Sequence, residues 1–127
     1  MSFAFSPDEG LVVVHAEMVG PLGSIILRLA LDTGATATMI NAALLTAIGY
    51  DPSATLERVQ VTTGSGVEYV PRVEIARVKV LGHERTSFWV LSHTLPPSAT
   101  IDGLLGLDFL RGQSLTIDFR QGQVSLN

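Results

Sequence analysis

The sequence contains no cysteine and few charged residues. The absence of cysteine from all 127 residues excludes a disulfide framework, a thiol nucleophile and thiolate metal sites, and it fits a reducing cytoplasm. Charged residues make up 16% of the chain, well under the roughly 25% of typical soluble domains, whereas hydrophobic residues reach 46%. A large apolar area therefore has to be buried, and a subunit interface would bury part of it.

Clusters of basic residues and long apolar runs are also missing. The net charge is −4 and lysine and arginine do not gather in one region, which argues against nucleic acid as a partner because phosphates call for a basic face. No apolar run approaches the roughly 18 residues that span a bilayer, and residues 1–10 show no basic segment or hydrophobic signal core. We expect a soluble, cytoplasmic protein that binds neither membrane nor nucleic acid, with residues 1–127 in one domain.

What the chain does contain is a series of short β-rich runs. They cover residues 11–18, 24–31, 57–62, 72–80, 86–91, 114–119 and 123–126. Glycine or proline stands in the connections at residues 20–23, 63–66, 81–83 and 120–122, as hairpin turns require. The pattern predicts an all-β barrel or sandwich in which neighbouring strands are antiparallel.

Two segments are predicted to be helical. Residues 41–48 begin with Asn41 as a candidate N-cap and end before Gly49, and residues 107–110 form a shorter turn. Residues 92–100 contain two consecutive prolines, which exclude a central strand, so we expect a surface loop there.

The tetrapeptide Asp32-Thr33-Gly34-Ala35 follows the apolar run of residues 25–31. This order places a carboxylate where a buried strand gives way to a tight turn, and a carboxylate in that position is partly desolvated. Asp, Thr and Gly all favour turns, and such a triplet arises by chance in roughly one chain in twenty of this length. Taken alone, the triplet is also compatible with an ordinary turn.

A second element lies later in the chain, at residues 101–110, where the apolar pair Leu104-Leu105 precedes Gly106 and a short helix. Taken alone, this element is a buried strand that ends where a helix starts. Gly106 has no side chain, so another backbone segment could pack closely against it. We expect that segment to be the turn that carries Asp32.

Together these two elements resemble the retropepsin family of aspartic proteases, in particular its cellular and bacterial single-domain members. In that family an Asp-Thr/Ser-Gly triplet and a later hydrophobic-hydrophobic-Gly motif frame the catalytic loop. The resemblance covers most of the chain and implies a closed acid-protease barrel with one lobe per chain and one or two short helices. The acidic residues and the arginine of the viral branch are replaced by Thr36, Ala37 and Leu107, so both partners of an interacting pair are absent.

The resemblance also implies roles for individual residues. Asp32 would be the catalytic carboxylate, Thr33 would tie two active-site loops together across a dimer axis, and Gly34 would let substrate backbone pass close by. The residues expected to contact substrate are Ala35 after the triplet, Thr63, Gly64, Ser65 and Gly66 at the tip of a glycine-rich flap hairpin, and Leu104 and Leu105.

The chain has a single Asp-Thr-Gly triplet, whereas the implied mechanism needs two carboxylates. Asp102-Gly103 lacks the hydroxyl residue, and Asp51, Asp108 and Asp118 have no such context, so we expect a two-fold homodimer to bring Asp32 against its own copy. The pair would share one proton, activate water and cut an extended peptide at apolar side chains, with activity that is bell-shaped in pH and greatest on the acid side of neutrality. The alternative is a non-catalytic module that kept the fold for dimerisation or peptide binding.

Other chemistry finds no support in the sequence. His15, His83 and His93 are scattered without the spacing of a zinc site. Neither a serine-hydrolase elbow nor a phosphate-binding loop is present. We therefore expect no metal and no cofactor.

Two further expectations concern packing. The large apolar side chains are expected in the core, with a pocket wall as the alternative for the aromatic ones, and these are Met18, Met39, Phe88, Trp89, Phe109 and Phe119. Residues 115–119 and 124–126 could form either an intersubunit sheet or a simple hairpin within one barrel, and the sequence leaves both open.

Overall fold

The computed structural model describes residues 1–127, with the side chain of Thr63 excepted. The strands are β1 (Ser2–Ala4), β2 (Val13–Gly20), β3 (Gly23–Leu31), β4 (Met39–Asn41), β5 (Arg58–Thr63), β6 (Gly66–Val80), β7 (His83–His93), β8 (Gly103–Leu105), β9 (Leu115–Asp118) and β10 (Gln123–Leu126). The helices are α1 (Ala42–Ala47), the 3-10 turn η1 (Pro52–Ala54) and α2 (Leu107–Leu110). Both predicted helices are confirmed, and Asn41 caps α1 by accepting a hydrogen bond from the Ala43 N–H.

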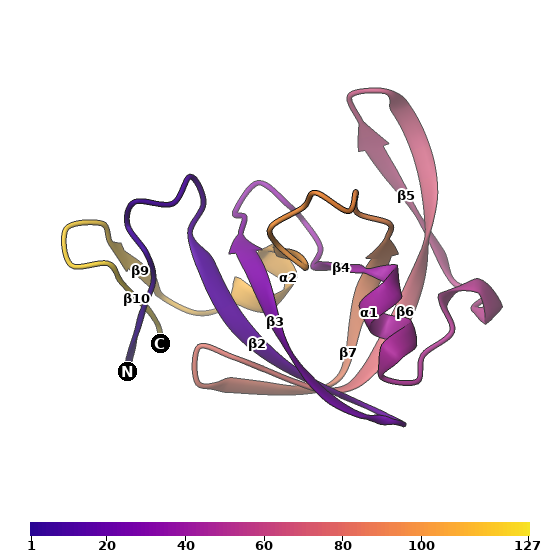
Figure 1. Ribbon diagram of the computed structural model, residues 1–127, viewed down its shortest axis with the longest axis horizontal. Helices are drawn as coiled ribbons and strands as arrows, with labels where there is room; N and C mark the ends of the chain where they lie inside the picture. Colours follow the sequence, from indigo (N-terminus) through magenta and orange to yellow (C-terminus); the bar gives the residue numbers. More distant parts are fainter.

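The larger sheet has seven strands in the order β2-β3-β8-β4-β7-β6-β5. An additional pairing between β2 and β6 closes this sheet on itself, so β2, β3, β8, β4, β7 and β6 make a barrel. β5 is attached to β6, and the β5–β6 hairpin rises away from the barrel at the upper right of Figure 1. The all-β class and the closed barrel predicted from the sequence are confirmed.

The barrel contains two parallel strand pairs that no local sequence pattern predicts. The hairpins β2–β3, β5–β6, β6–β7 and β9–β10 are antiparallel, as their turn residues indicate. In contrast, β8 pairs in parallel with β3, which sets Leu31 beside Leu105, and β4 pairs in parallel with β7. Parallel pairs are joined by long connections instead of tight turns. The segments that follow β3 and β8 consequently leave the sheet side by side.

The hydrophobic core fills the inside of the barrel. Its fully buried members include Met18, Leu27, Leu29, Ile40, Leu45, Ile75, Val90, Leu105 and Phe109. Burial of each such side chain stabilises the fold by about 1.5–3 kcal/mol. The core positions predicted for Met18 and Phe109 are confirmed. The prediction for Phe119 is wrong, because this residue lies in the β9–β10 turn, where it is 63% exposed and its ring edge contacts Phe5.

The first and last strands of the chain form a separate three-stranded sheet in the order β1-β10-β9, drawn at the left of Figure 1. β10 pairs with β1 on one side and with β9 on the other. His83, at the start of β7, brings its ring Nε2 within 2.6 Å of the Leu126 carbonyl oxygen and so links this sheet to the barrel. The two outer edges of the sheet therefore belong to β1 and β9.

The Tyr50 hydroxyl joins two strands of the barrel behind α1. It donates to the Val19 carbonyl on β2 at 3.1 Å and accepts from the Ala76 N–H on β6 at 2.8 Å. The register of β2 with β6 ends at Val19 opposite Arg77, so the hydroxyl links the two strands just past their last paired residues. The tyrosine hydroxyl therefore takes the place of a backbone partner.

We expect Tyr50→Phe to lower the free energy of unfolding by about 0.5–1.5 kcal/mol, since the Ala76 N–H and the Val19 carbonyl would lose their shared partner. Urea denaturation followed by fluorescence or circular dichroism measures the change. The matched control is Tyr69→Phe, because Tyr69 is 66% exposed on the β5–β6 hairpin. Equal effects of the two substitutions would show that the Tyr50 hydroxyl does not stabilise the barrel.

Candidate active site

Asp32 stands at the end of β3, at the start of a turn that we call the acidic turn (residues 32–37). The Asp32 N–H donates to the Leu105 carbonyl on β8 at 3.0 Å, which continues the β3–β8 pairing by one residue. The turn is then closed by two hydrogen bonds, from the Gly34 N–H to Asp32 Oδ1 at 2.9 Å and from the Ala35 N–H to the Asp32 carbonyl at 3.2 Å. The carboxylate is therefore held on a fixed backbone and is half-buried.

The acidic turn packs directly against the glycine that follows β8. The Leu107 N–H donates to the Ala35 carbonyl at 2.8 Å. A Cβ atom placed on Gly106 would lie 2.7 Å from the Ala37 carbonyl carbon and 3.0 Å from the Ala35 oxygen, closer than real side chains come. The close approach expected at Gly106 is confirmed, and the backbone it faces is that of the acidic turn.

Thr38 and Asp108 anchor this contact from behind. The Thr38 hydroxyl donates to Asp108 Oδ1 at 2.7 Å and accepts from the Gly106 N–H at 3.1 Å, while the Thr38 N–H donates to Asp108 Oδ2 at 2.9 Å. Thr38 is 1% exposed. Sequence reasoning set Asp108 aside because it lacks the triplet context. The available indication was its position in the first turn of α2, directly after the Gly106 motif.

A groove of about 260 Å³ opens between the acidic turn and the β5–β6 hairpin. Gly34 and Ala35 line one side, Val59 and Val61 of β5 line the other, and Leu91 lies between them. The remaining lining residues are Thr36, Ala37, Met39, Gln60 and Thr62. Met39 therefore lines the groove, whereas the sequence predicted that it would lie in the core. Sequence reasoning missed most of these residues, because their side chains meet only after the strands have paired.

The predicted substrate residues of the hairpin tip lie beyond this groove. Gly64 and Ser65 form the two-residue turn between β5 and β6, and Gly66 follows with a φ of +128°, a conformation that favours glycine. All three are exposed. The side chain of Thr63 lies outside the described residues. Within one chain, the acidic turn therefore faces the strand β5 of the hairpin, and Gly64, Ser65 and Gly66 are not among the residues that line the groove.

Leu104 and Leu105 differ in their access to the groove. Leu104 is half-buried between Ala30 and Met39 in the strand register. Leu105 is 1% exposed in the core, which leaves its side chain no surface for a peptide within this chain. Its link to the acidic turn is the backbone carbonyl that accepts the Asp32 N–H.

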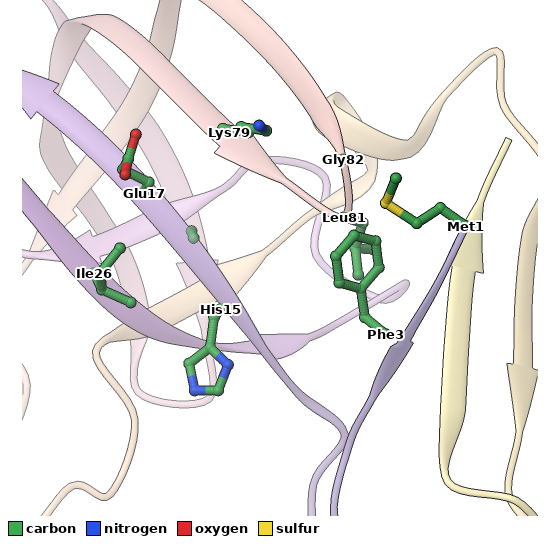
Figure 2. A pocket seen from close by; sticks show the side chains of 9 residues that line it. Met1, Phe3, His15, Glu17, Ile26, Lys79, Leu81 and Gly82 are labelled. Atoms are coloured by element: carbon green, nitrogen blue, oxygen red, sulfur yellow. The ribbon is translucent and has the colours of Figure 1, made fainter.

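A separate hollow of about 350 Å³ lies on the outer side of β2, against β1 and the β6–β7 turn (Figure 2). Its lining includes Met1, Phe3, His15, Glu17, Ile26, Lys79 and Leu81. None of its lining residues is shared with the groove at the acidic turn. Among the described side chains, no three His, Cys, Asp or Glu residues gather as a metal site would need, and no described helix is long and apolar enough to cross a membrane.

Comparison with known families connects the acidic turn, the β5–β6 hairpin and the Gly106 motif. The family model described as "gag-polyprotein putative aspartyl protease" matches residues 23–112, which is more than half of the chain and contains all three features. The chain belongs to this retropepsin-like family of aspartic proteases. No curated protein matches the chain.

A solved structure carries the same retropepsin-like fold. The crystal structure of a retropepsin-like aspartic protease from Rickettsia conorii superposes with a TM-score of 0.72 at 20% sequence identity, and the match covers 100% of this chain and 89% of that chain. Most of the side chains therefore differ while the path of the backbone is shared. The barrel is the retropepsin-like fold predicted from the sequence.

We expect Asp108→Ala to destabilise this retropepsin-like fold by about 1–3 kcal/mol, because the Thr38 N–H and hydroxyl would lose their acceptors in a buried place. Asp108→Asn should cost less, since an amide can accept from the Thr38 N–H and donate to its hydroxyl oxygen. Urea denaturation gives the free energies, and hydrogen exchange at the Gly106 and Thr38 amides locates the loss.

The control is Asp118→Ala. Asp118 also accepts two backbone hydrogen bonds, from the Arg120 and Gln121 N–H groups, but it is exposed, so water can replace it. Similar losses for Asp108→Ala and Asp118→Ala would contradict the anchoring role.

Proposed function

We propose that the protein is an aspartic endopeptidase that works as a homodimer, with one Asp32 carboxylate from each chain. The observation that carries the proposal is the acidic turn itself, in which Asp32 is held at the strand end by β8, Gly106 and Thr38 beside an open groove. An anchored carboxylate of this kind suits catalysis because catalytic groups must be held close to their reactive geometry. A single chain supplies one such turn, so the second carboxylate comes from a second copy.

The chemistry follows from two carboxylates in contact. Two like charges at short distance are unfavourable, so the pair holds one proton between them. The ionised carboxylate accepts a proton from a bound water, whose oxygen attacks the scissile carbonyl carbon while the protonated carboxyl group donates a hydrogen bond to the carbonyl oxygen. Collapse of the tetrahedral intermediate breaks the C–N bond, and the leaving nitrogen receives the proton. Activity is accordingly bell-shaped in pH, since both the ionised and the protonated member are needed.

The remaining residues of the turn and hairpin have supporting roles in this proposal. Thr33 is exposed, and its hydroxyl makes no hydrogen bond to the part of the chain that the structure describes, which leaves it available to the partner's turn. Gly34 and Ala35 line the groove and have small side chains or none, so the substrate backbone can approach closely. The tip at Gly64, Ser65 and Gly66 closes over the peptide from above, with Leu104 beside the cleft.

The outer surface offers places for a second copy. β10 already has a neighbour on each side, so an intersubunit strand can add to the terminal sheet at the edge of β1 or of β9. Met1, directly before β1, is 82% exposed, and Phe119, directly after β9, is 63% exposed, which leaves apolar area beside that sheet to be covered. Exposed apolar area of this kind supports association, because its burial is favourable.

Asp32→Asn should reduce cleavage of unfolded protein or a peptide library at mildly acid pH by at least about a thousandfold, because an amide cannot accept the proton of the attacking water. Circular dichroism and sedimentation should show an unchanged fold and mass. Asp51→Asn serves as the matched control and should keep full activity, because Asp51 is exposed and, like Asp32, accepts a hydrogen bond from the N–H two residues further on. Peptide cleavage that persists in Asp32→Asn, or that is absent from the wild type while peptides still bind, would favour the non-catalytic module.

Mixing experiments test the dimer. If two copies of Asp32 are required, nine parts of Asp32→Asn added to one part of wild type should lower wild-type activity about tenfold, since most wild-type chains then pair with an inactive partner. The control mixes wild type with an equal excess of Asp51→Asn, which keeps active pairs. Activity that does not change on addition of Asp32→Asn, after time for exchange of subunits, would mean that one chain is sufficient.

A further inference from the structure

The groove beside the acidic turn continues into a second cavity. This cavity has a volume of about 420 Å³ and shares three wall residues with the groove, namely Ala37, Val59 and Leu91. Its other lining residues are Arg72, Ser87, Phe88, Trp89 and Asp108. Trp89 therefore belongs to a pocket wall, the alternative that the sequence left open, whereas Phe88 both lines the cavity and packs against the core through Phe109. Because the two spaces meet at shared residues, a peptide that leaves the acidic turn along the groove enters this cavity next.

The far wall of this cavity is formed by Arg72 lying on Trp89. The Arg72 guanidinium carbon is 4.2 Å from the centre of the Trp89 ring. Arg72 pairs with Leu91 and Glu74 pairs with Trp89 across β6 and β7, so Arg72 and Trp89 are diagonal neighbours on the strand face that borders the cavity. A guanidinium stacked on an aromatic ring is held in one plane while its N–H groups remain free to bind a carboxylate.

Arg72 has no ion-pair partner among the described residues. The ion pairs of those residues join Arg28 with Glu9 and Arg77 with Glu84. Glu57 meets Arg72 through its backbone carbonyl, which accepts the Arg72 N–H at 2.9 Å. Glu74, two residues along the same strand face, is exposed and forms no ion pair with it within 4 Å. The guanidinium charge is therefore available to a ligand.

Asp108, the acid that lines the same cavity, forms no ion pair with Arg72 within 4 Å. Both carboxylate oxygens of Asp108 accept hydrogen bonds from Thr38, so Asp108 is committed to the anchor of the acidic turn. Ser87 adds a local irregularity to the wall, because its φ of +50° is uncommon for a residue with a side chain. Such conformations persist where the surrounding structure holds them, often beside binding sites.

We propose that this cavity is a specificity subsite for an acidic side chain of the peptide substrate, with the carboxylate of Asp or Glu bound by Arg72 on its Trp89 platform. The inference rests on the proposed function and names the substrate class. An extended peptide presents alternate side chains to one face, so one side chain on each half of the substrate would reach the Arg72 of the chain that holds it. The two-fold axis then predicts acidic preferences at equal distances on both sides of the cleaved bond.

A positional-scanning peptide library read by mass spectrometry tests the proposal. We expect one position on each side of the cleaved bond at which Asp or Glu raises kcat/KM about 5- to 10-fold over Gln or Asn, as expected for a hydrogen bond between charged groups. In Arg72→Gln this acidic-to-neutral ratio should fall to about one, and in Arg72→Glu the preference should turn to Lys or Arg. The matched control is Arg77→Gln, an exposed arginine of the same strand, which should keep the wild-type ratio.

Binding to the Asp32→Asn protein separates this inference from the proposed function. Fluorescence anisotropy with the same peptides reads the subsite without turnover, and we expect acidic peptides to bind about 5- to 10-fold more tightly than their amide counterparts, less so at high salt. Equal affinities, or a preference that survives Arg72→Gln, would overturn the subsite whether or not the wild type cleaves. Absence of cleavage together with an Arg72-dependent preference would instead overturn the endopeptidase and leave the subsite in place.

Discussion

The anchoring of the acidic turn by one buried threonine is the contact on which the site depends. Thr38 accepts a hydrogen bond from Gly106 and donates to Asp108, so a single hydroxyl joins the segment after β3 to the segment after β8. A turn has no ladder of its own to hold it, and without such a tie the carboxylate of Asp32 would stand on a flexible connection. Gly106 completes the contact, because any side chain there would push the two backbones apart.

A single chain does not contain all the parts that the proposed active site needs. The groove has a wall from the acidic turn and a wall from β5, but the tip residues 64–66 do not line it, and the Thr33 hydroxyl makes no hydrogen bond within the described part of the chain. Only 16% of the residues are charged, and large apolar side chains remain exposed around the terminal sheet. A second copy would cover apolar area and supply the second carboxylate in one step.

Long, regular elements could be predicted from the sequence with good accuracy, and short ones could not. Alternation and turn glycines identify β2, β3, β5, β7 and the β9–β10 pair within a few residues, and Asn41 correctly marks the start of α1. The prediction for β6 was too short, because this strand already begins at Gly66 and not at residue 72. The strands β1 and β4 have three residues each, too few to show any periodicity, and they exist because a distant strand is available to pair with them. The parallel pairing of β3 with β8 escapes prediction for the same reason.

For the site, the sequence alone determined the position of the acidic turn and the need for a glycine at residue 106, because both follow from the order of residues along a strand and its turn. Only the tertiary structure decided which side chains support and surround that turn. Asp108 carries no local indication that it binds Thr38, since the two residues are 70 positions apart and meet through the β3–β8 pairing. Likewise, the sequence predicted that Leu105 would contact substrate, but its side chain lies in the core. Arg72 and Trp89 form one wall of a cavity because the pairing of β6 with β7 places them on the same face. Contacts between distant segments depend on the closed barrel as a whole, and no short stretch of sequence encodes them.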